Sequence, residues 1–402
     1  MSKKHTKMAP FTQLVEAGKS GKWFDQIVNP PVVRSSTHLY HSEAERKEAQ
    51  KHNRDGVFYY GRRGGPTQWA LSDAITNIEP GSYGTVLYPS GVAAIVGSLM
   101  TVLRPGDTFL ISDNSYEPSR QSALGLLKKW GVKCRFIDPL NLELFEKAFC
   151  SQTKAVWFES PGSLTMEISD IPALTAIARD KGAVSLIDNT WATSLGFSAL
   201  ELGCDISVMS LTKHVGGHSD VMMGSASAKK KWYRALRLTS QQFGLVVSPD
   251  DASLMLRGLR TMGLRLKQST QSALKIARWL EQRSEVAHVL CPMLESDPGF
   301  KIWNRDFKGG CGLFSFVLRG RDEKARARLV DNLKLFGIGY SWGGFESLAL
   351  PFDPGSIRTS THWPLQSWEK ADRLGVRLSI GLEDPDDLIS DLSQAFEEMD
   401  KA

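Results

Sequence analysis

From about residue 85, short apolar runs alternate with longer amphipathic segments, and this alternation restricts the possible folds more than any other feature of the sequence. Segments 118–130, 141–149 and 171–181 have the apolar spacing of helices. The runs between such segments are rich in β-branched and aromatic residues, as buried strands are: TVLYPS, DTFLIS, KCRFID, AVWFES, AVSLID and ISVMSL. The alternation predicts βαβ units, and therefore an α/β fold whose mostly parallel central sheet is covered by helices on both faces.

The segments on either side of this region have a different pattern. Residues 12–20 have helical spacing, but the prolines of the following NPPVVRSSTHLY disfavour regular structure and indicate an extended arm. Beyond residue 260, helical patterns (263–284, 323–336 and from Pro385) and the strand patterns GLFSFVLRG and VRLSIG indicate a smaller α+β domain. We expect an N-terminal arm (1–62), an α/β domain (63–259) and a C-terminal α+β domain (260–402).

Composition excludes several classes of function. The net charge of +5 is spread along the 402 residues, so no basic face for nucleic acid is indicated. The five cysteines lie far apart without a C-x-x-C pair, which argues against a disulfide framework or a zinc cluster. His214 and His218 are spaced like a helical metal pair, but the glycines between them disfavour that helix, and we expect no metal site. No apolar stretch is long enough for a signal peptide or a membrane span, so we expect a cytoplasmic protein that binds no membrane.

The carboxyl ends of the predicted strands are the places to look for a site, because ligands of open α/β sheets bind there. TVLYPS ends in Ser90-Gly91, which begin a helix of small residues whose free N–H groups suit a phosphate. AVSLID ends in Asp188, a carboxylate that needs a partner when it is buried. A protonated heterocyclic nitrogen would be such a partner.

The strand run ISVMSL is followed by further reactive groups at the same edge. Ser210, Thr212 and Lys213 precede the flexible segment HVGGHSD, and a desolvated lysine amine can attack a carbonyl carbon. Tyr116 follows DTFLIS, where it could stack on an aromatic ring. Each feature alone has an ordinary explanation as a helix cap, a turn residue or a surface lysine. Together they are the parts that pyridoxal 5'-phosphate requires of a protein.

Several longer motifs are more specific than these single residues. They include NPPVVRSST (29–37), YGRRGGPT (60–67), YPSGVAAI (88–95), LIDNTWA (186–192), SLTKHVGGHSDVMMG (210–224) and GYSWGGFES (339–347). Through these motifs nearly the whole chain resembles the transsulfuration family, the pyridoxal-phosphate enzymes of cysteine and methionine metabolism. The resemblance implies fold type I of these enzymes, the aspartate aminotransferase-like fold, with a cofactor-binding central domain.

The resemblance also implies which residues hold pyridoxal 5'-phosphate. Lys213 would form the Schiff base, Asp188 would bind the ring nitrogen and Tyr116 would stack on the ring. The phosphate would be held by Ser90, Gly91, Val92, Ser210 and Thr212. Tyr60 and Arg62, in the arm, would reach the phosphate of the neighbouring subunit, which implies a homo-oligomer, a tetramer built from dimers with shared active sites.

The remaining implied roles concern the substrate. Arg377 would bind its α-carboxylate, and Tyr340, Ser341 and Trp342 would lie beside it. γ-Enzymes of the family usually have Glu and Leu where this chain has Tyr340 and Trp342, whereas the β-lyase branch has Tyr and Trp. The resemblance therefore implies a carbon–sulfur lyase of methionine biosynthesis. It would use Lys213 and Tyr116 to split L-cystathionine by β-elimination into homocysteine, pyruvate and ammonia, with cysteine or cystine desulfhydration as a side activity.

Two alternatives remain open at this point. The first is a γ-enzyme on the same scaffold: a cystathionine γ-lyase or γ-synthase, or a methionine γ-lyase. The second is a non-catalytic regulator that keeps the fold, since fold alone does not determine function.

Overall fold

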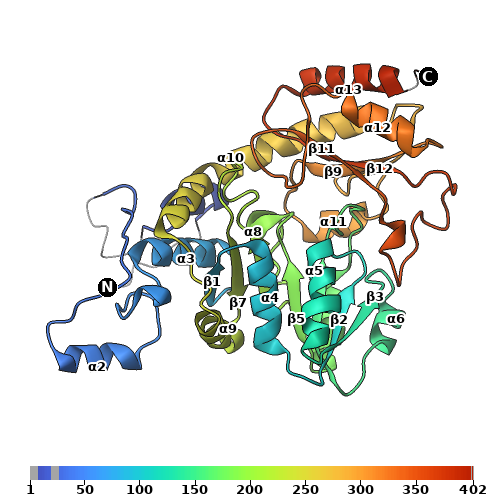
Figure 1. Cartoon of the computed structure of the whole chain (residues 1–402). Coiled ribbons are helices and arrows are strands. Elements are labelled where there is room, and N and C mark those ends of the chain that lie inside the picture. Colours follow the sequence, from blue (N-terminus) through green and yellow to red (C-terminus); the bar gives the residue numbers. More distant parts are fainter. Residues whose placement is uncertain (1–7, 20–26, 400, 402) are drawn as a thin grey trace.

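The computed structural model describes residues 8–19, 27–399 and 401 (Figure 1). The N-terminal segment contains α1 (Pro10–Glu16), α2 (Glu43–Lys51) and the 3-10 turn η2 (Gly61–Arg63). The α/β region contains α3 (Pro66–Ile78), β1 (Gly84–Tyr88), α4 (Gly91–Val102), β2 (Thr108–Ser112), α5 (Glu117–Ser122), the π-helical η3 (Ala123–Leu127), β3 (Lys133–Ile137), α6 (Leu142–Lys147), β4 (Thr153–Glu159), α7 (Ile171–Asp180), β5 (Val184–Asp188), α8 (Thr193–Gly196), β6 (Ile206–Ser210), β7 (Gly224–Ala228) and α9 (Lys230–Gln242). The C-terminal elements are α10 (Pro249–Leu280), β8 (Val286–Leu290), α11 (Phe300–Asp306), β9 (Leu313–Leu318), α12 (Glu323–Asp331), β10 (Gly337–Ile338), β11 (Leu348–Phe352), the 3-10 turn η4 (Pro354–Ser356), β12 (Gly375–Ser379) and α13 (Pro385–Met399).

A seven-stranded sheet in the order β1-β7-β6-β5-β4-β2-β3 forms the centre of the α/β region. β7 pairs antiparallel with β1 and β6, and the other paired neighbours are parallel. Alternate strand residues enter two separate cores: Phe109 and Ile111 pack on the face covered by α4, η3 and α9, and Leu110 on the face covered by α3 and α7. The predicted mostly parallel sheet with helices on both faces is therefore confirmed.

The C-terminal elements form a second, five-stranded sheet in the order β10-β11-β12-β9-β8. Its pairs are antiparallel except β10 with β11. The long helix α10 packs on α3 at its start and on α13 near its end, so it connects the two regions (Figure 1). The α+β character predicted for the C-terminal part is confirmed.

Some elements differ from the sequence-based expectations. β7 was not predicted, and α10 begins at Pro249 rather than at residue 263, so the predicted boundary between residues 259 and 260 falls inside this helix. The helix expected at 12–20 is α1, which ends at Glu16; residue 20, like 1–7 and 21–26 of the predicted arm, lies outside the described residues. The NPPVVRSSTHLY segment has no helix and a single bridge, between Thr37 and Tyr60. No helix in the described ranges is both long and apolar enough to cross a membrane.

Candidate active site

A cavity of about 270 Å³ lies at the carboxyl ends of the parallel strands, where loops of the C-terminal sheet meet the α/β region. Most of the residues singled out in the sequence line it: Ser90, Gly91, Val92, Tyr116, Asp188, Ser210, Thr212, Lys213, Tyr340, Trp342 and Arg377. Ser341 joins them through a hydrogen bond to Lys213. The expectation that the strand ends gather at one place therefore agrees with the structure.

The start of α4 forms one wall of the cavity. Ser90 caps this helix, because its Oγ accepts a hydrogen bond from the backbone N of Ala93 at 3.1 Å. A Cβ added to Gly91 would lie 2.8 Å from Oγ and Cβ of Ser210, so only glycine allows α4 to approach the end of β6 this closely. The uncapped N–H groups of the first turn and the nearby hydroxyls form a cradle suited to a phosphate.

Asp188 is the last residue of β5, and its two carboxylate oxygens differ in their hydrogen bonds. Its Oδ1 accepts hydrogen bonds from the backbone N and the Oγ1 of Thr190, at 3.0 and 2.5 Å. No group in the described part of the chain donates to Oδ2. Burial raises the pKa of Asp188, against the hydrogen bonds from Thr190. The carboxylate therefore gains from a cationic hydrogen-bond donor in the cavity, such as a protonated ring nitrogen.

Lys213 follows β6, and its Nζ donates a hydrogen bond to Ser341 Oγ at 2.7 Å. Burial, and next the charge of Arg377, lower the pKa of Lys213 to about 8. At pH 7 about a tenth of this amine is therefore neutral and nucleophilic, far more than of an ordinary lysine. Ser341 has a positive φ of 78°, so the backbone of the GYSWGG segment is strained at the point where it meets the lysine.

Arg377 projects from β12, and its Nη2 donates to the backbone O of Ser341 at 3.0 Å. Its Nε is buried without a hydrogen-bond partner in the described residues. Burial lowers the pKa of Arg377 to about 10, which leaves it charged at neutral pH. The guanidinium can therefore hold a carboxylate near Lys213.

Tyr116 lies between β2 and α5, and 40% of its surface is exposed. Its backbone N donates to Glu159 Oε2 at 2.6 Å. Burial, and next the charge of Asp188, raise the pKa of Tyr116, so its hydroxyl remains protonated at neutral pH.

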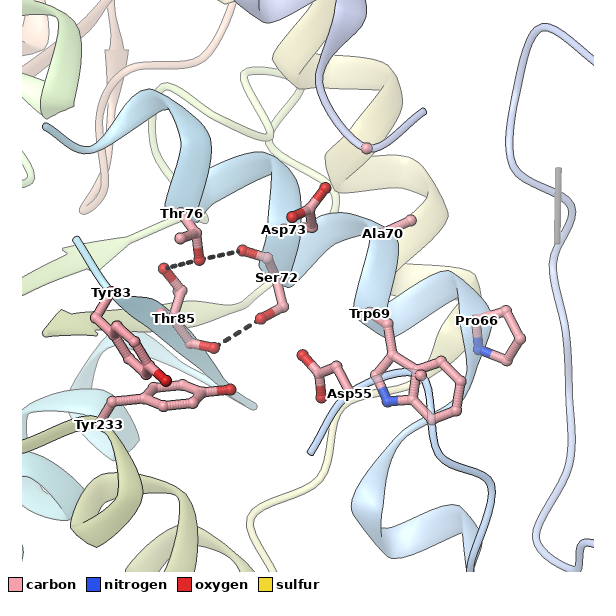
Figure 2. A pocket seen from close by; sticks show the side chains of 13 residues that line it. Asp55, Pro66, Trp69, Ala70, Ser72, Asp73, Thr76, Tyr83, Thr85 and Tyr233 are labelled. Carbon is pink, nitrogen blue, oxygen red and sulfur yellow. Dashed lines mark hydrogen bonds between the residues drawn. The ribbon is translucent and has the colours of Figure 1, made fainter. Parts of the chain in front are cut away.

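Tyr60 and Arg62 are absent from the lining of this cavity. Arg62 Nη1 instead donates to the backbone O of Gln241 at 2.6 Å, and Tyr60 is 47% exposed. A second cavity, of about 260 Å³, lies between α3, β1 and α9, with Ser72, Thr85 and Tyr233 in its wall (Figure 2). None of the predicted site residues lines it.

The residues of the main cavity that sequence analysis missed include Glu159, Thr190 and Arg358. Glu159 is the neighbour of Asp188 in the pairing of β4 with β5. Glu159 is the last residue of β4, just as Asp188 is the last residue of β5, so the strand-end rule could have identified it. Arg358 lies on a loop after η4, and no local pattern marks it.

The available oxygen of Asp188, the Gly91 cradle and the amine of Lys213 fit pyridoxal 5'-phosphate in one cavity, and the family comparison agrees. The model of the Cys/Met metabolism PLP-dependent enzyme family matches residues 11–397. The chain belongs to this family of pyridoxal-phosphate enzymes, so the cofactor predicted from the sequence is confirmed.

Individual relatives are similar over almost their full length. Cystathionine beta-lyase MetC of Escherichia coli (strain K12) is 40% identical over 96% of this chain and 97% of its own length. Cystathionine beta-lyase of Salmonella typhimurium is 39% identical over the same shares. The crystal structure of metB from Corynebacterium glutamicum superimposes with a TM-score of 0.86 at 29% identity, covering 97% of this chain and 98% of that one. This likeness confirms the predicted fold type.

Proposed function

We propose that this enzyme is a carbon–sulfur lyase that converts L-cystathionine by β-elimination into homocysteine, pyruvate and ammonia. The observation that carries the proposal is that Lys213, Asp188, Tyr116 and Arg377 line one cavity. The names of the relatives support the same reaction. Tyr340 and Trp342 support the β-lyase branch, because they line the cavity at positions where γ-enzymes usually have Glu and Leu.

Pyridoxal 5'-phosphate, when bound, supplies a carbonyl that links to amines and a ring that accepts the electrons released at Cα. Asp188 would hold the ring nitrogen through Oδ2, and Tyr116 would stack on the ring. Ser90, Gly91, Val92, Ser210 and Thr212 would hold the phosphate. Arg377 would bind the substrate α-carboxylate and so direct the Cα–H bond toward Lys213.

Lys213 moves the protons in this proposal. Its Nζ, with a pKa of about 8, takes the proton from Cα and delivers a proton to the sulfur that leaves from Cβ. The Tyr116 hydroxyl, which is protonated at neutral pH, assists this transfer. Homocysteine departs, and the remaining three-carbon fragment takes up water to give pyruvate and ammonia.

The test is to incubate the purified holoenzyme with L-cystathionine and to quantify four products together. Pyruvate with homocysteine supports β-elimination. Cysteine with 2-oxobutyrate would mean a γ-lyase and would refute the roles of Tyr340 and Trp342. No product from cofactor-loaded protein would favour another substrate or a non-catalytic role.

We further propose a homotetramer built from dimers, in which the arm (1–62) completes the site of its neighbour. Tyr60 and Arg62 lie apart from the cavity of their own subunit, as this arrangement requires. A cytoplasmic location is proposed as well, because the five cysteines are free thiols and a reducing compartment keeps them so.

A further inference from the structure

His214 directly follows Lys213 and contacts the segment that carries Ser341 and Trp342. Only 5% of His214 is exposed, and its ring packs on that of Trp342 with the ring centroids 5.3 Å apart. The same indole ring has Lys213 Nζ at 5.4 Å from its centroid, within the range of a cation–π contact. One tryptophan side chain therefore contacts both the amine that the proposed chemistry uses and the residue next to it.

Arg265, from α10, holds the backbone of this part of the chain. Its Nη1 donates to the backbone O of His214 at 2.8 Å, and its Nη2 donates to the backbone O of Gly258 at 2.7 Å. Gly217, with a φ of 69°, leaves space for the guanidinium, because a Cβ there would lie 1.8 Å from Arg265 Nη1. The backbone at His214 is thus fixed to α10 independently of any ligand.

The ring of His214 is confined and uncharged. Gly343, with a φ of 79°, passes so close that a Cβ there would lie 3.0 Å from His214 Nδ1. A cavity of about 10 Å³ adjoins both residues, space for about one water molecule, so the ring has little room to turn. Burial, and next the charge of Arg265, lower the pKa of His214 to about 3, so the ring is neutral near neutral pH. Its Nε2 is buried without a hydrogen-bond partner in the described residues, so an apolar ring would lose no hydrogen bond at this atom.

We propose that His214 is a positioning residue, whose ring holds Trp342 and the Ser341 segment against the amine of Lys213. The inference rests on the proposed function, because that function assigns the proton transfer at Cα to Lys213. The backbone of Ser341 is strained, and the hydrogen bond from Lys213 Nζ to Ser341 Oγ depends on where this segment lies. His214 itself does not line the main cavity, so it acts through Trp342. Without the imidazole ring, the indole can move away from the amine, and Lys213 loses the geometry that proton transfer requires.

The first test is a pH titration of the visible absorbance of the bound cofactor, which follows the proton on Lys213 Nζ and needs no substrate. The face of an indole stabilises a nearby cation, so we expect His214→Ala to move the midpoint to lower pH by about half a unit, a roughly threefold loss of proton affinity. His214→Phe keeps a ring that packs on Trp342 and should keep the wild-type midpoint. The charges of Asp188 and Arg377, which act on Lys213, are the same in every variant.

The matched control for this titration is His288→Ala. His288 stacks on Trp368 with the ring centroids 3.7 Å apart, and neither residue lines the main cavity, so the midpoint should not change. An unchanged midpoint in His214→Ala, or an equal shift in His214→Phe, would overturn the proposal. If His214→Ala does not fold, His214→Leu, which fills more of the space but has no ring, is judged by the same midpoint.

The second test measures the consumption of L-cystathionine, which β- and γ-elimination both require. We expect His214→Ala to lower kcat about tenfold and to change KM by less than about twofold. Trp342→Leu should also lower kcat about tenfold, and the double variant should be no slower than Trp342→Leu alone, because His214 acts through Trp342. Losses that multiply to about a hundredfold, or an effect of His214→Ala on KM alone, would overturn the proposal.

The two tests separate this inference from the proposed function. Cysteine and 2-oxobutyrate as products would refute β-elimination, yet losses of kcat that do not multiply would still support the role of His214. If the wild-type holoenzyme consumes no L-cystathionine, the proposed function fails, and the titration alone decides whether His214 positions Trp342 against Lys213.

Discussion

Lys213 is the residue on which the proposed chemistry depends, because its amine both attaches the cofactor and moves protons. We expect Lys213→Ala to lower pyruvate formation from L-cystathionine about a thousandfold or more, together with loss of the visible absorbance of the bound cofactor. The fold should persist, as judged by circular dichroism. Lys154→Ala, at an exposed position, is the control and should retain full activity. Substantial lyase activity in the Lys213 variant would refute the assignment.

Glu159 shows how burial, and next a neighbouring charge, raise the pKa of a carboxyl group. Burial and the adjacent Asp188 raise its pKa well above the ordinary value, so we expect Glu159 to be protonated when it accepts the hydrogen bond from Tyr116. A raised folded-state pKa contributes stability that is complete below the unfolded-state pKa and is lost as the pH rises through the folded one.

The corresponding experiment compares Glu159→Gln with Glu159→Leu in urea unfolding. Glutamine is neutral and keeps an accepting oxygen, so its free energy of unfolding should match that of the wild type within about 0.5 kcal/mol at about pH 4, below the unfolded-state pKa. Leucine leaves the backbone N of Tyr116 unpaired and should cost about 1 to 3 kcal/mol. The wild type should lose stability relative to the Gln variant as the pH rises. If glutamine proves as harmful as leucine, Glu159 is ionised in the fold.

At the scale of elements, the contact between Asp113 and the loop after η4 joins the two sheets. Burial opposes ionisation of Asp113, but hydrogen bonds from Ser360, Arg120 and Thr361 outweigh it and lower its pKa from 3.8 to about 2. A lowered folded-state pKa contributes stability above the unfolded-state value. That contribution is lost as the pH falls from about 4 to about 2.

We expect Asp113→Asn to lower the free energy of unfolding by about 2 to 3 kcal/mol at pH 7, because the variant leaves the buried Arg120 without its anion. The difference from the wild type should shrink toward pH 2, as measured by urea unfolding across this range. Asp180→Asn, whose carboxyl is 75% exposed in the side chain, is the control. A difference that does not change with pH would show that Asp113 is not ionised in the folded protein.

The elements also show what local patterns can and cannot predict. The strands β1 to β6 can be predicted from their apolar, β-branched composition. In contrast, β7 has the sequence GSASA, whose small residues form no pattern typical of a strand. Its small side chains let α4 approach, since a Cβ on Gly224 would lie 2.4 Å from the backbone O of Ser90. The early start of α10 was marked by Ser248, which caps it, and by Pro249 in its first turn, so this signal was available.

At the scale of the whole molecule, sequence reasoning located the part of the site that follows from strand topology. Parallel strands bring Ser90, Tyr116, Asp188 and Lys213 to one sheet edge, whatever the loops do. The position of Arg358 depends instead on hydrogen bonds between Asp113 and the backbone of residues 359–361, which are far from Asp113 in the sequence. Such contacts depend on how loops of the C-terminal region meet the α/β region, so no local pattern reveals them.

The shared active site is a property of the assembly and can be tested by mixing subunits. Lys213→Ala removes the amine of a subunit's own site, whereas Arg62→Ala removes a group that we propose to serve the neighbour. In a mixed dimer, the subunit with intact Lys213 receives the intact arm of its partner, and one site is complete. We therefore expect the two variants, unfolded together and refolded in equal amounts with cofactor, to recover about a quarter of wild-type pyruvate formation.

The same experiment can also contradict the shared site, because the two possible positions of Arg62 predict different recovered activities. If Arg62 served its own subunit, every site in the mixture would lack either Lys213 or Arg62, and mixing would restore nothing beyond the activities of the separate variants. Arg62→Ala alone should hold the cofactor more weakly, as measured by its dissociation on dialysis. The control is the double variant mixed with wild type. In its mixed dimers, the site with an intact Lys213 receives a substituted Arg62 from the partner, and the site that receives an intact Arg62 has a substituted Lys213. Neither site of such a dimer is complete.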